Sequence, residues 1–110
     1  MLEGSPLADD VRVSSYAAGI LILGCDNAPA TFDIDGMDAS VAPGTGTPEV
    51  GGLSYEQARR FLELVCTRNR LVGFDLVEVN PSFDPTQITA LLSAQIMIEA
   101  MGFVFPRGRN

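Results

Sequence analysis

The order of hydrophobic and polar positions predicts extended structure in the first third of the chain. Residues 16–24 (YAAGILILG) are almost entirely apolar and indicate either a buried strand or a short helix, because periodicity alone does not distinguish the two. Residues 30–35 (ATFDID) alternate, with Thr31, Asp33 and Asp35 on one face and apolar side chains on the other. We therefore expect a strand over 30–35, preceded by one apolar element of either type.

A helix is predicted to begin after Ser54. Ser54 and Gln57 match a capping box, in which each side chain satisfies a free backbone N–H group of the first turn. An apolar stripe follows at helical spacing, and it consists of Ala58, Phe61, Leu62 and Val65. Arg68 and Arg70 stand near the expected end of this helix, where positive charge stabilises the helix dipole.

The next segment, residues 71–79 (LVGFDLVEV), predicts a second strand. It is apolar on both faces apart from two acids, a pattern typical of a central parallel strand covered by helices. The order of strand, loop, helix, strand and helix then predicts an α/β fold with parallel strands and right-handed crossovers.

The last predicted helix follows a short break at Asn80-Pro81. Asp84 is expected to cap it, with Pro85 at the first helical position and Gln87 completing another capping box. Residues 88–101 are apolar nearly all round, so this helix should be well buried, and Gly102 should end it. The tail that follows is a candidate for an edge strand.

Composition excludes several kinds of chemistry. The 110-residue chain has 14 acidic and 7 basic residues, a net charge of −7 and no histidine, and every basic residue is an arginine. Histidine bases, histidine metal ligands and lysine Schiff bases are therefore excluded within this chain. The acidic balance argues against a nucleic-acid surface. We expect Cys25 and Cys66 to be reduced and packed as small hydrophobes. No apolar run approaches the ~20 residues of a membrane span, and the N-terminus does not fit a secretory signal, so we expect a cytoplasmic protein.

Asp33 and Asp35 are the first candidates for chemistry. Carboxylates two positions apart on a strand point the same way, and they stand here at its carboxyl end, where α/β sheets place their sites. Oxygen ligands suit hard divalent cations, so the pair is a plausible half of a metal site. A calcium loop of the EF-hand type is excluded, because its fifth and twelfth positions would be Met37 and Gly44. The alternative is that these aspartates form Asx-turns that cap the following loop.

Residues 36–52 form a long loop that contains five of the eleven glycines and two prolines. Long irregular loops inside compact domains are usually functional or disordered, and the ordered segments that follow favour function. The loop superficially resembles two nucleotide motifs, but Glu49 replaces the last glycine of the dinucleotide pattern and Gly52 replaces the lysine of the phosphate loop. Composition alone therefore indicates only a shaped loop with small polar groups.

Two longer stretches closely resemble the ureohydrolase family, which contains arginase, agmatinase, guanidinobutyrase and formimidoylglutamase. The stretches are Thr31-Phe32-Asp33-Ile34-Asp35-x-x-Asp38 and Ala42-Pro43-Gly44-Thr45-Gly46-Thr47-Pro48-Glu49-x-Gly51-Gly52-Leu53. Gly73–Pro81 looks like the family's next strand and Ile88–Leu92 like the start of its last helix, both closer to the agmatinase branch. The resemblance implies the C-terminal part of a three-layer α-β-α arginase-like fold with a parallel sheet.

The resemblance also implies roles for single residues. Asp33 and Asp35 fall on two ligands of a manganese pair, Glu78 on the glutamate that grips the substrate guanidinium, and Thr47 on a threonine near that group. Asp38 would support the loop or the metal ligands. The implied reaction is manganese-dependent hydrolysis of a small guanidino compound, agmatine-like, to urea and an amine, in an enzyme that forms homo-oligomers.

The sequence departs from the family in one important respect. The family's other metal ligands are a histidine and an Asp-x-His-x-Asp motif upstream, and this chain has neither. Residues 1–27 match the family poorly, so we assign 28–110 to the C-terminal part of a ureohydrolase domain and 1–27 to a separate segment. We expect the chain to be inactive by itself. Two alternatives stay open: a non-catalytic remnant that only oligomerises, and a one-ion site at Asp33 and Asp35.

Overall fold

The computed structural model describes residues 12–15, 20–23 and 28–105. The first two of these ranges are strands, β1 (Arg12–Ser15) and β2 (Ile20–Leu23), which pair antiparallel. This decides between the two interpretations of the apolar run at 16–24, because its described part is extended. β2 lies against β3, the next strand along the chain.

Two parallel strands form the part of the sheet that positions the site. β3 (Ala28–Asp33) pairs with β4 (Leu71–Val77), and Asp33 stands opposite Val77 at their carboxyl ends. β3 ends two residues earlier than the sequence predicts, because a short 3-10 helix, η1 (Ile34–Gly36), begins directly after Asp33. The parallel pairing confirms the α/β class.

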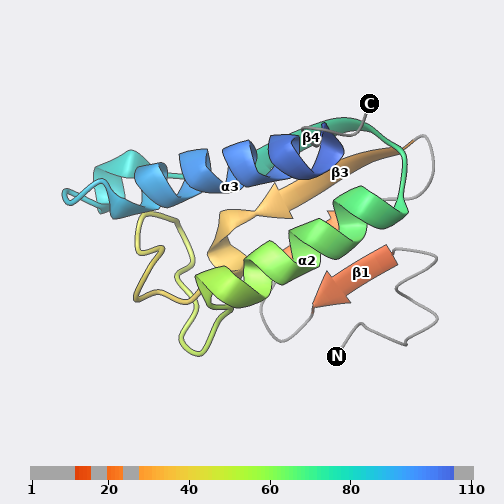
Figure 1. The fold of residues 1–110 in the computed structure, drawn as a ribbon. Helices are drawn as coiled ribbons and strands as arrows, with labels where there is room; N and C mark the ends of the chain where they lie inside the picture. The colour runs from red at the N-terminus through yellow and green to blue at the C-terminus, as the bar shows by residue number, and fades with distance from the viewer. Residues whose placement is uncertain (1–11, 16–19, 24–27, 106–110) are drawn as a thin grey trace.

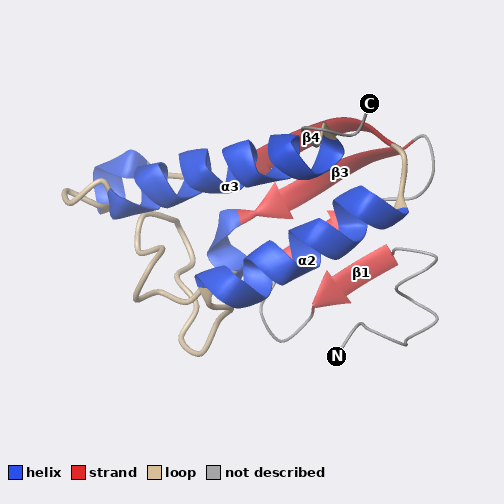
Figure 2. Ribbon diagram, in the orientation of Figure 1, coloured by secondary structure: helices blue, strands red, loops and turns tan. Residues whose placement is uncertain are grey.

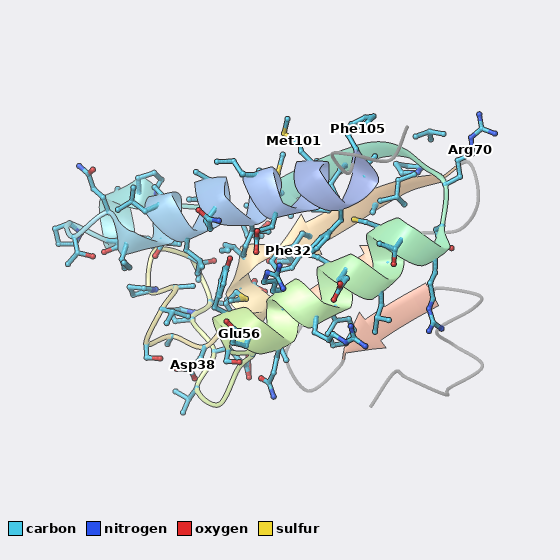
Figure 3. The ribbon with its side chains drawn as sticks, in the orientation of Figure 1. Phe32, Asp38, Glu56, Arg70, Met101 and Phe105 are labelled. Carbon is cyan, nitrogen blue, oxygen red and sulfur yellow. The ribbon has the colours of Figure 1, made fainter. Side chains whose placement is uncertain are left out.

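The capping box predicts the first long helix correctly. α2 spans Tyr55–Arg68, the Ser54 hydroxyl accepts from the Gln57 N–H, and the Gln57 side chain accepts from the Ser54 N–H. All four residues of the predicted stripe are buried. Figure 1 shows α2 and α3 (Ile88–Val104) running alongside each other, in the direction opposite to β3. The core lies between these helices and the strands, and Phe32 of β3, labelled in Figure 3, is completely buried.

The start of α3 corrects the sequence prediction. A short 3-10 helix, η2 (Pro81–Phe83), precedes Asp84, and α3 begins only at Ile88. Gln87 is the N-cap in a left-handed conformation, and its side chain makes no capping hydrogen bond, so the second capping box is wrong. Asp84 does cap the helix, but it does so by accepting from the Thr89 N–H five residues further on.

The surroundings of α3 and β4 also differ from the prediction. Only Thr89, Ser93, Ile96 and Ala100 of α3 are buried, whereas Leu91, Ile98 and Met101 are each at least 60% exposed. Within the described part of the chain, β4 pairs with β3 alone, so it is an edge strand and not a central one. Among the described elements, α3 packs mainly against α2 and, to a smaller extent, against β4, which leaves much of its apolar surface exposed.

The end of the chain differs as well. α3 continues through Gly102 to Val104, so Phe103 and Val104 are helical and do not add an edge strand. Residues 106–110, the rest of the predicted tail, lie outside the described residues, as does Cys25. Cys66 is a buried free thiol, as expected. No helix in the described ranges is long and apolar enough to cross a membrane.

Candidate functional site

Asp33 and Asp35 come together where β3 turns into η1. Asp33 is the N-cap of η1, and its Oδ1 accepts from the Asp35 N–H at 3.0 Å. This Asx-type turn is the alternative considered from the sequence, and it keeps both carboxylates at the carboxyl end of the strand. Capping and ligand roles are compatible, since each carboxylate can accept several interactions.

The electrostatics of Asp33 are unfavourable for its charged form. The pKa of Asp33 is raised from 3.8 to about 6, and burial is the largest cause. The negative charges of Asp35 and Glu78 contribute to this rise, while the hydrogen bond from the Asp35 N–H partly offsets it. Like charges held close together in a partly buried place are a frequent feature of functional sites, where a cation or substrate relieves the repulsion.

Glu78 approaches this pair from the neighbouring strand. It is the residue after β4, one position beyond Val77, which pairs with Asp33. Its φ is 73°, in the left-handed region that residues other than glycine rarely adopt. Backbone strain of this kind is retained where the surrounding structure enforces it, and it gathers at functional sites.

Thr47 joins the same group from the long loop. Its hydroxyl donates to Asp35 Oδ2 at 2.9 Å across twelve positions of sequence. The loop that carries it has no regular element between η1 and α2, as predicted and as Figure 2 shows. Four of the five residues singled out from the sequence therefore meet at one edge of the β3–β4 pair: Asp33, Asp35, Thr47 and Glu78.

The fifth, Asp38, lies apart and anchors the loop. Its Oδ1 accepts from the N–H groups of Gly51 and Gly52 at 2.9 and 3.1 Å, and its Oδ2 accepts from the N–H and hydroxyl of Ser40. These bonds lower the pKa of Asp38, with Ser40 the largest cause. A Cβ on Gly52 would stand 2.7 Å from the backbone of Asp38 and Met37, so glycine is required there. Asp38 thus ties together two parts of the loop, and its support of the metal ligands stays a prediction.

The sequence reasoning missed a second anchor of the same loop. The Gly44 N–H donates to Thr89 Oγ1 at 2.8 Å, and that hydroxyl donates to Asp84 Oδ2 at 2.7 Å. Asp84 and Thr89 are both buried, and hydrogen bonds from Thr86 and Thr89 lower the pKa of Asp84 to about 2. The sequence carries no signal for this anchor, because the burial of Asp84 and Thr89 is seen only in the fold and the bond joins positions 45 apart.

A comparison with protein families decides the relationship. A family model described as "Arginase family" matches residues 12–102, most of the chain. The chain belongs to the arginase family. The matched range starts within the segment 1–27 that the sequence reasoning set apart, and the division at residue 28 stays a prediction.

Individual arginase-family proteins give the same result. The chain is 49% identical over 71 residues to an agmatinase of Proteus mirabilis, covering 64% of this chain and 23% of that protein. It is 49% identical over 71 residues to a guanidinobutyrase of Pseudomonas aeruginosa, covering 64% and 22%. Its structure matches proclavaminate amidino hydrolase from Streptomyces clavuligerus with a TM-score of 0.66 at 36% identity, covering 71% and 26%. The arginase-like fold is thereby confirmed, and the chain spans about a quarter of the length of these relatives.

The carboxylates at the end of β3 are of the chemical type that suits a hard divalent cation. Asp33 and Asp35 supply hard oxygen ligands, and their mutual repulsion would be relieved by a cation. The described residues contain no group of three histidine, cysteine, aspartate or glutamate side chains that could hold a metal ion. A stable site for a pair of ions therefore needs ligands beyond those described here.

Proposed function

We propose that this chain supplies part of the active site of an arginase-family enzyme that hydrolyses a guanidino compound with manganese. The observation that carries the proposal is the meeting of Asp33 and Asp35 after β3, Thr47 from the long loop, and Glu78 after β4. The similarity to an agmatinase and to a guanidinobutyrase supports an agmatine-like substrate class.

Each residue has a physically suitable task in that reaction. Asp33 and Asp35 would hold manganese, which supplies the Lewis acidity that makes water nucleophilic near neutral pH. Glu78 would bind the guanidinium through paired charge-assisted hydrogen bonds and so fix its plane. The Thr47 hydroxyl orients Asp35 and stands beside the same space. Water adds to the guanidinium carbon, the bond from that carbon to the alkylated nitrogen breaks, and the amine leaves with a proton while urea is released.

We further propose that the chain does not complete this reaction by itself. Two carboxylates are too few ligands for a tightly held pair of ions, and the described residues offer no third. Purified chain incubated with Mn²⁺ and agmatine, arginine or guanidinobutyrate should release no urea. Urea release together with two tightly bound manganese ions per chain would contradict this part of the proposal.

The site itself can be tested without activity. Mn²⁺ at substoichiometric concentration broadens nuclear magnetic resonances close to where it binds, and we expect the amide signals of Asp33 and Asp35 to broaden first. Asp33→Asn and Asp35→Asn should remove the selective broadening, whereas Glu56→Gln, an exposed acid on α2 (Figure 3), should not. Broadening centred elsewhere in the wild type would overturn the metal assignment.

The exposed face of α3 favours a second candidate, a non-catalytic remnant that associates with itself. Exposed apolar residues recur along α3 and its C-cap at alternating spacings of three and four, at Leu91, Ala94, Ile98, Met101 and Phe105. This spacing is typical of helix-to-helix seams. The one charged residue of α3, Glu99, is turned toward α2, so two copies could approach along the seam without charge repulsion. Sedimentation of the chain and of Ile98→Glu would test it: a wild-type dimer that dissociates in the variant supports self-association, and a wild-type monomer excludes it.

A further inference from the structure

The strained backbone of Glu78 is held from both sides. On the N-terminal side, Val77 pairs with Asp33 in the β3–β4 ladder. On the C-terminal side, the Asn80 N–H donates to the Gly44 carbonyl at 2.7 Å. The Asn80 side chain also accepts from the N–H and hydroxyl of Ser82, which fixes the chain as it leaves the site. The conformation at Glu78 therefore depends on where Gly44 is placed.

Gly44 is in turn placed by two buried side chains, Asp84 and Thr89, that are not among the proposed site residues. Its N–H donates to Thr89 Oγ1, and the Thr89 hydroxyl and N–H both donate to Asp84 Oδ2. A Cβ on Gly44 would lie 2.8 Å from Asp84 Cβ and 2.9 Å from Thr89 Oγ1, so the loop backbone packs directly on this pair. The connected hydrogen bonds run from Asp84 through Thr89 and Gly44 to Asn80, two residues beyond Glu78.

We propose that Thr89 and Asp84 are positioning residues for Glu78: through Gly44 they hold the backbone after β4 so that Glu78 stays in its left-handed conformation beside Asp33. The inference rests on the proposed function for the task given to Glu78, but the positioning itself is a property of the fold. A carboxylate turned in this way is pre-organised, and pre-organisation lowers the ordering cost of binding a guanidinium.

The second oxygen of the Asp84 carboxylate provides the matched control. Asp84 Oδ1 accepts from the N–H and hydroxyl of Thr86, which is exposed and whose hydroxyl accepts from the Ile88 N–H. Thr86→Val and Thr89→Val thus each remove one hydroxyl group that donates to Asp84. Only the second removes the acceptor of the Gly44 N–H.

The experiment measures the conformation of Glu78 by nuclear magnetic resonance on the folded full chain. A residue with positive φ gives a strong nuclear Overhauser effect between its own amide proton and its α proton. We expect this signal at Glu78 in the wild type. Thr89→Val should lose it and should speed exchange of the Gly44 and Asn80 amide protons by at least ~10-fold, the factor that corresponds to a lost hydrogen bond. Thr89→Ser, which keeps the hydroxyl, should restore both.

Thr86→Val and the core variant Val65→Ala should keep the Glu78 signal, although Val65→Ala lowers overall stability. Persistence of the signal in Thr89→Val would overturn the inference. Its loss in Val65→Ala would do so too, because general destabilisation alone would then be enough to change the conformation of Glu78. If Thr89→Val does not fold, Asp84→Asn takes its place with the same expected result. A parallel titration with agmatine, followed by the amide signal of Glu78, separates the two proposals. If this signal does not shift in the wild type, the proposed guanidinium-binding role of Glu78 is excluded. The conformational signal still tests whether Thr89 and Asp84 position Glu78.

Discussion

Replacing Gly44 with alanine should destabilise the chain, because the loop backbone lies against Asp84 and Thr89. The added Cβ would meet Asp84 Cβ at 2.8 Å and Thr89 Cβ at 3.0 Å. Favourable carbon contacts lie at roughly 3.5–4.0 Å, so the loop must move by about half an ångström or more. Overpacking of this kind costs about 1–3 kcal/mol. The movement also lengthens the Gly44 hydrogen bond to Thr89, which adds to the cost.

Gly46→Ala is the matched control for this change. It lies two residues away in the same loop, its Cβ would meet nothing within 4 Å, and its backbone is outside the left-handed region. Both substitutions restrict the unfolded chain equally, an effect that stabilises by about 0.4–1 kcal/mol. The difference in unfolding free energy between the two variants therefore isolates the clash.

The assay is urea unfolding followed by far-ultraviolet circular dichroism, because the chain contains no tryptophan. We expect Gly44→Ala to be less stable than Gly46→Ala by about 1–3 kcal/mol, which corresponds to roughly 4–8 °C in Tm for each kcal/mol. Equal midpoints for the two variants would refute the packing of Gly44 on the Asp84–Thr89 pair.

Three further substitutions and one labelling experiment have defined outcomes. Asp33→Asn should raise the unfolding free energy at pH 7 by roughly 1 kcal/mol, an effect that partial exposure reduces. Because the folded pKa of Asp33, about 6, exceeds the ordinary value of 3.8, the unfolding free energy of the wild type should fall as pH rises between these values. Urea titrations across that range should show a flatter profile for the variant. Thr45→Val should be neutral or stabilising by about 1 kcal/mol, because its buried hydroxyl has no partner among the described residues, and a lower unfolding midpoint would reveal one. Tyr55→Phe removes the hydroxyl that donates to Glu99 and should lower stability by about 1 kcal/mol or more without changing the β3 edge, as unfolding and amide spectra can show. Burial raises the pKa of Cys66 to about 11, so its labelling by a thiol reagent at pH 8 should follow the rate of unfolding, and immediate labelling would contradict its burial.

Local signals in the sequence predicted the local parts of the structure. The capping box at Ser54 and Gln57 placed the start of α2 correctly, since both bonds close within one turn. Alternation placed β3, and the aspartates at its end marked the site edge. The sequence identified Asp84 as a cap of α3 but not its partner, because Asp84 reaches Thr89 across five positions, outside the spacing of any capping box.

The contacts that assemble the site are long-range, which explains why single-sequence reasoning found the residues but not all of the connections. The Gly44–Thr89 bond joins positions 45 apart, and the Thr47–Asp35 bond joins positions twelve apart. Family resemblance selected Asp33, Asp35, Thr47 and Glu78 without stating how the fold holds them. The burial of α3 was predicted from its composition, but exposure depends on which neighbours it has, and these do not follow from an apolar pattern.

The two anchors of the loop explain how a segment without regular structure can present a precise side chain. Near its N-terminal end, Asp38 gathers the N–H groups of Gly51 and Gly52, and in its middle Gly44 is held by Thr89. Thr47 lies between these two fixed points, exposed yet bonded to Asp35. The hydrogen bonds to Asp38 and Asp84 thus help to offset the cost of placing the like charges of Asp33 and Asp35 close together at the end of β3. Because the anchors use hydrogen bonds within the chain itself, the site edge should stay ordered even when no metal or substrate is bound.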